Sequence, residues 1–286
     1  MADEPKNLAG GYGDGTVDTV LSIGDVAREA EAMARSAPRE EIVALAKGEP
    51  LLSLDALHAG YGAMEILHGI DLAVGAGQSL CLVGPNGAGK STVLHSIFGF
   101  TKISSGRVSV SGRDVTRLSP SEKLRDAGVA YILQDNSVFP DMTVEENLLM
   151  GGYLLGDQGR AREAAERIFA RYERLAKRRS ERARVLSGGE RRLLEISRAL
   201  IMDPKVLLVD EPSIGLEPRM IDMVFEILAD LQHGQGKTIV MVEQNAKRGL
   251  DFADIGYVLV AGRVALAGEG ADLLENPDVG RLFLGG

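Results

Sequence analysis

A glycine-rich stretch limits the folds open to this chain: Gly84-Pro85-Asn86-Gly87-Ala88-Gly89-Lys90-Ser91-Thr92. It fits the phosphate-loop pattern G-x-x-x-x-G-K-[ST], and the apolar run Ser79 to Val83 directly precedes it, as the pattern requires. The glycines let consecutive N–H groups point inward as an anion-binding nest, and the helix expected to start near Gly89 adds its positive dipole end. We therefore expect this loop to bind phosphate groups.

Two side chains in the loop have specific expected roles. Lys90 would reach the β- and γ-phosphates of a nucleotide as a point charge, and the Ser91 hydroxyl would be a ligand of Mg²⁺. All residues from Gly84 to Thr92 are thus candidate nucleotide-binding residues, and Mg-nucleoside triphosphate is the expected ligand. The alternative is a glycine-rich turn that happens to precede a helix.

Composition excludes several classes of protein. The chain has 286 residues, of which 45% are hydrophobic, enough for a substantial core. No run approaches the roughly 18 uncharged apolar residues of a membrane-spanning helix, so work at a membrane would require a partner. Met1 to Lys6 lacks an apolar segment, and the single Cys81 fits a reducing compartment, so a cytosolic location is expected. A net charge of -9 argues against a nucleic-acid partner.

Residues 1–50 differ in character from the rest of the chain. The sequence from Gly10 to Gly15 is turn-prone, which predicts a partly disordered start. Apolar residues at helical spacing from Ile23 to Ala34, and a second helix start near Pro38, predict two short amphipathic helices. We expect an N-terminal extension that packs on the main domain or on a partner, or that forms a loosely attached arm.

Residues 51–286 are predicted to form an α/β domain with a mainly parallel sheet, because strands and helices alternate. Strand signals stop between Asp135 and Asp203, where Thr143 and Glu146 form a capping box, and this predicts a helical insertion over about residues 135–203. The predicted strands are 51–57, 67–74, 79–83, 106–111, 129–133, 206–209, 238–242 and 257–260. The predicted helices include 90–98, 119–126, 159–179, 189–202 and 221–231.

The run Lys205 to Val209 is an apolar strand that ends in two adjacent acids, Asp210 and Glu211. Successive side chains at a strand end point in different directions, so the two acids can perform different tasks. Asp210 would hold Mg²⁺, and Glu211 would polarise an attacking water as general base. Hydrolysis is the expected reaction. The alternative is a pair of charges that merely terminate a strand at the surface.

The segment from Leu186 to Glu190 has the sequence LSGGE and begins the helix that is predicted to end at Met202. In the order phosphate loop, Gln134, Leu186 to Glu190, then Lys205 to Glu211, the chain resembles the ATP-binding cassette (ABC) ATPases, from about Leu51 to its end. The resemblance implies a P-loop NTPase core with an antiparallel β-subdomain and a helical insertion. It also implies ATP as the nucleotide.

The resemblance further implies roles for single residues. Tyr61 matches the aromatic residue that stacks on adenine, and Gln134 matches the glutamine that touches Mg²⁺ and the attacking water. Ser187, Gly188 and Gly189 match the signature that grips the γ-phosphate bound to the opposite subunit. One chain offers one phosphate loop and one signature, so the implied partner is a second cassette, identical or homologous, packed head to tail.

Two positions depart from the family pattern. Glu217 stands where the family usually has Asp, and Gln244 stands where it has a switch histidine near the γ-phosphate. The amide of Gln244 can donate a hydrogen bond to phosphate but cannot gain a proton near neutral pH. The histidines do not replace it and, from their spacing, form no metal-ligand cluster. They are His58, His68, His95 and His233.

Within the family, the segments 142–148, 215–218 and 242–246 look like those of ATPase subunits from branched-chain amino-acid, amide or urea importers. Those relatives often carry an acid where this chain has Gln134. The resemblance implies transmembrane permease subunits facing residues 137–148, a periplasmic binding protein as an indirect partner, and a peripheral place on the cytoplasmic side of the inner membrane. A soluble ABC ATPase that acts in assembly or scaffolding is the alternative. A small-molecule kinase with a phosphate loop is a second alternative, but a kinase would not need the LSGGE segment that this chain has.

Gln244→His is expected to leave ATP binding intact and to preserve or increase hydrolysis, because it restores the imidazole found at this place in the resembling family. Nucleotide titration and steady-state ATP turnover measure the two effects. A complete loss of turnover would show that the switch position lies elsewhere in the chain.

Overall fold

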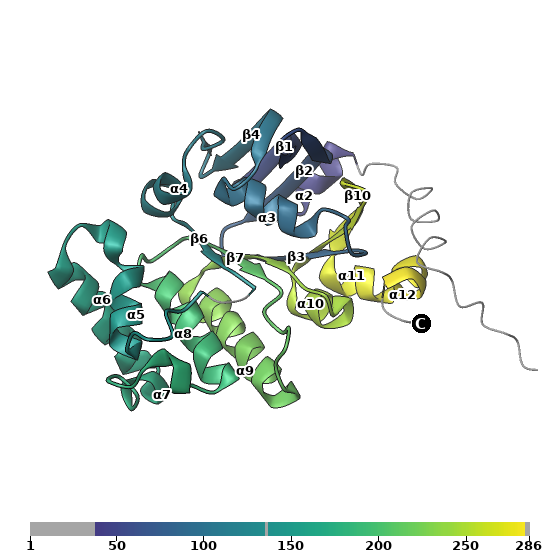
Figure 1. The fold of residues 1–286 in the computed structure, drawn as a ribbon. Helices are drawn as coiled ribbons and strands as arrows, with labels where there is room; N and C mark the ends of the chain where they lie inside the picture. Colours follow the sequence, from purple (N-terminus) through teal and green to yellow (C-terminus); the bar gives the residue numbers. More distant parts are fainter. Residues whose placement is uncertain (1–37, 135–136, 284–286) are drawn as a thin grey trace, which may run out of the picture.

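The computed structural model describes residues 38–134 and 137–283, which form two β-sheets with helices between and around them (Figure 1). The turn-prone segment from Gly10 to Gly15 and the predicted helix from Ile23 to Ala34 lie outside these residues.

A six-stranded sheet carries the phosphate loop. Its strand order is β10-β9-β3-β8-β7-β6, and β10 alone is antiparallel to its neighbour. All residues of β3, β7, β8 and β9 are buried, as in parallel sheets covered on both faces. The predicted, mainly parallel sheet is thus confirmed. Its strands are β3 (Ser79–Val83), β6 (Val129–Ile132), β7 (Val206–Asp210), β8 (Thr238–Val242), β9 (Ile255–Val260) and β10 (Arg263–Glu269).

The second sheet is antiparallel, with the order β2-β1-β4-β5, which confirms the expected β-subdomain. Its strands are β1 (Pro50–Tyr61), β2 (Met64–Gly75), β4 (Lys102–Val110) and β5 (Arg113–Asp114). Strand β1 runs to Tyr61, beyond the predicted end at Leu57. Its register shifts between Leu54 and Leu57, where Ala56 has a φ of 42°. Such a bulge interrupts the alternation of apolar residues from which the strand was predicted.

Helix α3 (Lys90–Phe98) lies between the two sheets and contacts strands of both (Figure 1). Its Val93, Leu94 and Ile97 are fully buried in the core that the sheets share. The start of α3, and with it the end of the phosphate loop, is therefore fixed by apolar packing on either side.

A mainly helical region follows β6 and lies at the end of the molecule away from β10 (Figure 1). It has its own buried apolar cluster, which includes Val144, Leu148 and Leu194. The single helix predicted over 159–179 is wrong: α6 ends at Arg171, and Tyr172 leaves helical geometry with φ -115° and ψ 83° before α7 begins. The region comprises α5 (Val144–Gly151), η1 (Tyr153–Leu155), α6 (Gln158–Arg171), α7 (Glu173–Ala176), η2 (Ala183–Val185) and α8 (Gly188–Leu200).

The other helices flank the two sheets. Those that follow β7 include a π-helical turn, η3, which continues α9. Ser119 caps α4 as predicted, with its side chain accepting from the backbone N–H of Glu122. These elements are α4 (Pro120–Asp126), α9 (Pro218–Ala229), η3 (Asp230–Gly234), α10 (Ala246–Phe252), α11 (Gly270–Glu275) and α12 (Pro277–Phe283).

The second of the predicted N-terminal helices is present as α2 (Arg39–Ala44) and packs on the main body. Its Ile42 is 2% exposed and belongs to the core between the sheets. The buried Gln78 holds the residues that follow α2 in place. Its Oε1 accepts from the Lys47 N–H at 2.8 Å, and its Nε2 donates to the Leu45 carbonyl at 3.2 Å. Residues 39–47 are thus integrated into the fold.

Candidate functional site

The phosphate loop joins β3 to α3. At two of its positions, Gly84 and Gly89, only glycine fits. Gly84 has a φ of 144°, and a Cβ there would lie 2.1 Å from the Leu259 carbonyl oxygen. Gly89, the N-cap of α3, has a φ of 98°, and a Cβ there would lie 2.9 Å from Leu67 Cδ2. A side chain at either position would displace the loop from the strands that hold it.

Lys90 folds back over this loop. Its Nζ donates to the carbonyl oxygens of Gly84 at 2.8 Å and Pro85 at 3.0 Å, and the residue is 8% exposed. Burial lowers the pKa of Lys90, while the nearby charges of Glu211 and Asp210 oppose that shift. The lysine places a buried positive charge at the loop, opposite two acids.

Asp210 ends β7 and is 5% exposed, so its carboxylate needs partners. The Ser91 hydroxyl donates to Oδ1 at 3.1 Å, and the Tyr131 hydroxyl donates to Oδ2 at 2.8 Å. Burial, followed by the Asp210 charge, raises the pKa of Tyr131 and keeps its hydroxyl a donor. The phosphate loop and the strand-end acid are thus joined directly.

Glu211 directly follows Asp210 and has a left-handed backbone, with a φ of 43°. Its N–H donates to the Val242 carbonyl at 2.9 Å, which ties it to the end of β8. The Gln134 Nε2 donates to Glu211 Oε2 at 3.0 Å. Two side chains 77 positions apart in the sequence therefore meet at the edge of the sheet.

The segment after β8 places Gln244 at the surface and buries its neighbour Glu243. Glu243 Oε1 accepts from the Ser213 hydroxyl at 2.7 Å and from the Asn245 N–H at 3.0 Å. Glu243 thus connects the loop after Glu211 to the loop that carries Gln244. Only this geometry indicates a role for Glu243, because a glutamate at the end of a strand is expected at the surface.

Ser187 begins α8 and closes a capping box with Glu190. A Cβ on Gly189 would lie 2.2 Å from Met220 Sδ, so this glycine allows α8 to approach α9 closely. Gly188 and Ser187 are exposed. The hydrogen bonds that join Ser91, Asp210 and Tyr131 do not extend to this helix start within the described part of the chain.

Tyr61, at the end of β1, is 42% exposed, and its hydroxyl contacts His95 Nδ1. The rings of Tyr61 and His95 meet edge to face with centroids 6.0 Å apart, and His95 meets Tyr131 in the same way at 5.7 Å. Burial lowers the pKa of His95. These three rings connect the end of β1 to Asp210.

Arg192 is a buried arginine that the sequence did not single out. It is 5% exposed, and its Nη1 donates to the Leu133 carbonyl at 2.7 Å and to Glu195 Oε2 at 2.8 Å. Its Nη2 donates to the Asp210 carbonyl at 3.4 Å. Arg192 thus joins the ends of β6 and β7 beside Gln134. Arginines on helices are mostly exposed, so the sequence offered no signal for this role.

The family model described as ABC transporter matches residues 67–214. The branched-chain amino acid transport ATP-binding protein BraG of Pseudomonas aeruginosa is 40% identical over 82% of this chain and 100% of its own length. The probable branched-chain amino acid transport ATP-binding protein LivF of Archaeoglobus fulgidus is 38% identical over 80% of this chain and 96% of its own length. The chain belongs to the ABC transporter family.

Solved structures agree with this membership. An ABC-transporter ATP-binding cassette crystallised in its ADP conformation is 30% identical, with a TM-score of 0.73, over 84% of this chain and all of that one. This ABC cassette is therefore an ATP hydrolase that works as a subunit of a membrane-associated transporter. Within residues 38–134 and 137–283, none of the helices has the length and apolar character needed to cross a lipid bilayer.

Tyr131→Phe in this cassette is expected to lower the free energy of unfolding by about 1–2 kcal/mol, because the buried Asp210 loses a hydroxyl donor while the ring remains. Urea denaturation measures the change. Tyr153→Phe is the control, since Tyr153 is 77% exposed and its hydroxyl is accessible to water. Equal effects of the two substitutions would contradict the role given to Tyr131.

Proposed function

We propose that this chain is the ATP-hydrolysing subunit of an importer for branched-chain amino acids or related small amides. The observation that carries the proposal is the 40% identity to BraG, a branched-chain amino acid transport ATP-binding protein, over the whole of that relative. The unit that hydrolyses ATP would comprise residues 51–286, with residues 135–203 as its helical subdomain.

The nucleotide would lie between Tyr61 and the phosphate loop. Tyr61 would stack on adenine, and its 42% exposure leaves ring surface available for that contact. The backbone N–H groups from Gly84 to Thr92 would surround the phosphates, with the start of α3 behind them. Lys90 would exchange its bonds to the Gly84 and Pro85 carbonyls for phosphate oxygens.

The donor set next to Lys90 suits Mg²⁺. Ser91 Oγ and Asp210 Oδ1 lie 3.1 Å apart, and both are the hard oxygen ligands that Mg²⁺ prefers. Ser91, Asp210 and Gln134 would hold the ion, directly or through water. When bound, Mg²⁺ would neutralise charge on the phosphate oxygens.

Glu211 would act as general base in hydrolysis. The water oxygen would bond to the γ-phosphorus while its proton moves to the Glu211 carboxylate, and the bond to the β–γ bridging oxygen would break to release ADP. Gln134 donates to that carboxylate at 3.0 Å, which supports a role in orienting it. The Gln244 amide would donate a hydrogen bond to the γ-phosphate but, unlike histidine, could not take up a proton and become positively charged.

A complete site would need a second cassette, identical or homologous, packed head to tail. Ser187, Gly188 and Gly189 would contact the γ-phosphate held by the phosphate loop of the opposite subunit. Ser187 and Gly188 are exposed at the start of α8, which supports this arrangement because a partner subunit can reach them. Hydrolysis would remove the contacts to the γ-phosphate and let the dimer open.

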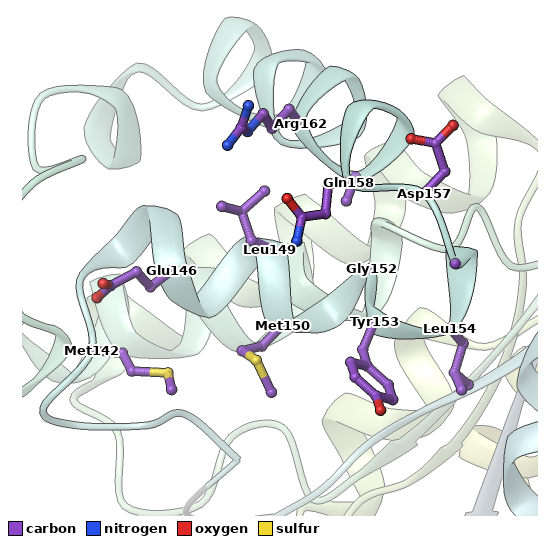
Figure 2. Close-up of a pocket in the computed structure, with 12 residues that line it drawn as sticks. Met142, Glu146, Leu149, Met150, Gly152, Tyr153, Leu154, Asp157, Gln158 and Arg162 are labelled. Atoms are coloured by element: carbon purple, nitrogen blue, oxygen red, sulfur yellow. The ribbon is translucent and has the colours of Figure 1, made fainter.

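The permease subunits would dock on the helical region, with the cassette on the cytoplasmic face of the inner membrane and a periplasmic binding protein as an indirect partner. A groove of about 730 Å³ lies along α5, η1 and the start of α6. Figure 2 shows Met142, Met150 and Tyr153 along one side of it, with Gln158 and Arg162 of α6 above them. Tyr153 and Met150 are 77% and 41% exposed, which suits a surface covered by a partner.

Glu211→Gln is expected to retain ATP binding but to lower ATP turnover at least about 100-fold, because the amide cannot accept the proton from water. With hydrolysis blocked, ATP and Mg²⁺ should hold the cassettes as a dimer, which sedimentation would detect. Glu226→Gln, an exposed acid on α9, is the matched control. Undiminished turnover by a monomeric Glu211→Gln variant would contradict the assignment.

Met150→Glu is expected to abolish copurification with the permease and to lower leucine uptake about tenfold or more, because a buried charge without a partner weakens an interface. Val43→Glu on α2 is the matched control, since Val43 is 40% exposed and Met150 is 41% exposed. Thermal melting shows whether both variants fold. If Met150→Glu copurifies as well as Val43→Glu does, the permease docks elsewhere.

A further inference from the structure

Three polar side chains gather on the outer face of the antiparallel sheet, outside the nucleotide site. His58 lies on β1, and Glu65 and His68 lie on β2. The strand register places His58 directly opposite His68, whereas their neighbours Leu57 and Leu67 are buried in the core. The expectation that the histidines form no cluster was therefore wrong for this pair.

The three side chains converge on one point. Glu65 Oε1 lies 2.9 Å from His58 Nδ1 and 3.1 Å from His68 Nδ1. One ligand atom from each of the three residues lies within 4.8 Å of the other two. Each imidazole is 36% exposed and Glu65 is 41% exposed, so a dissolved ion can reach the cluster.

The Nδ1 atoms of both rings face the Glu65 carboxylate, and glycine backbone lies near the opposite edges of the rings. A Cβ on Gly69 would lie 3.4 Å from His58 Nε2, and a Cβ on Gly262 would lie 2.9 Å from His68 Cδ2. A side chain at either glycine would therefore press on one of the two rings. The Ser104 hydroxyl donates to Glu65 Oε2 at 3.0 Å and leaves Oε1 facing the histidines.

We propose that His58, Glu65 and His68 bind a divalent transition-metal ion of the Zn²⁺ class. Two imidazole nitrogens and one carboxylate oxygen form a common Zn²⁺ ligand set, and water would complete the coordination. Zn²⁺ bonds of about 2.0–2.1 Å need ligand atoms about 3.4 Å apart, which small changes of side-chain rotamer would provide here.

The ligand types of this cluster differ from those of the Ser91–Asp210 site, because two of its three ligand atoms are imidazole nitrogens. Mg²⁺ prefers oxygen ligands alone, so the ion proposed for the Ser91–Asp210 site is not expected to compete here. The metal proposal is therefore independent of the proposed transport function.

The test titrates untagged, full-length protein with ZnCl₂ by isothermal calorimetry, in millimolar Mg²⁺. We expect one Zn²⁺ per chain and at least tenfold weaker binding for His58→Ala and for His68→Ala. His233→Ala is the matched control, because His233 is exposed and far from the cluster in sequence, and it should bind Zn²⁺ as the parent does. No saturable binding, or equal binding by all three variants, would overturn the proposal.

Two further measurements test whether His58, Glu65 and His68 bind a metal ion or only form hydrogen bonds with one another. Ser104→Ala should weaken Zn²⁺ binding about tenfold, because the carboxylate loses the donor that orients it. Zn²⁺ should raise the melting temperature of the parent protein but not that of the His58→Ala, His68→Ala double variant. A melting temperature that responds equally in both proteins would show that Zn²⁺ binds elsewhere.

Discussion

The parallel pairing of β3, β8, β7 and β6 determines where the candidate catalytic side chains lie. The carboxyl ends of these strands meet at one edge of the sheet, and each continues into a segment with a polar residue. Lys90 follows β3, Glu243 follows β8, Asp210 ends β7, and Gln134 follows β6. A change of register between β3 and β8 or between β8 and β7 would separate the Ser91 hydroxyl from the Asp210 carboxylate.

The same edge contains several buried charges, and these must be paired. Asp210 accepts from Ser91 and Tyr131, while Arg192 donates to the carbonyl groups beside it. Removing one of these partners leaves a buried charge with fewer hydrogen bonds, which lowers the stability of the fold. The buried side chains are therefore expected to hold one arrangement, and Gln134 holds the half-buried Glu211 carboxylate beside them.

The two outer parts of the molecule offer different surfaces. The helical region has its own apolar cluster and a groove lined by exposed methionine and tyrosine side chains. The antiparallel sheet packs one face against α3 and presents the other to solvent. On that face the register of β1 and β2 brings His58, Glu65 and His68 together. The N-terminal α2 covers part of the remaining core through Ile42.

The sequence alone determined the phosphate loop, the acid-terminated strand, the parallel sheet, the helix caps at Ser119 and Thr143, and the family. Each of these depends on local spacing, on hydrophobic periodicity or on motifs in a fixed order. The tertiary structure decided which distant side chains meet. The contacts of Tyr131 with Asp210, of Arg192 with two strand ends, and of His58 with His68 depend on strand pairing and on the bulge in β1. Local pattern cannot reveal them, because nothing in a short window of sequence specifies the register between strands far apart in the chain.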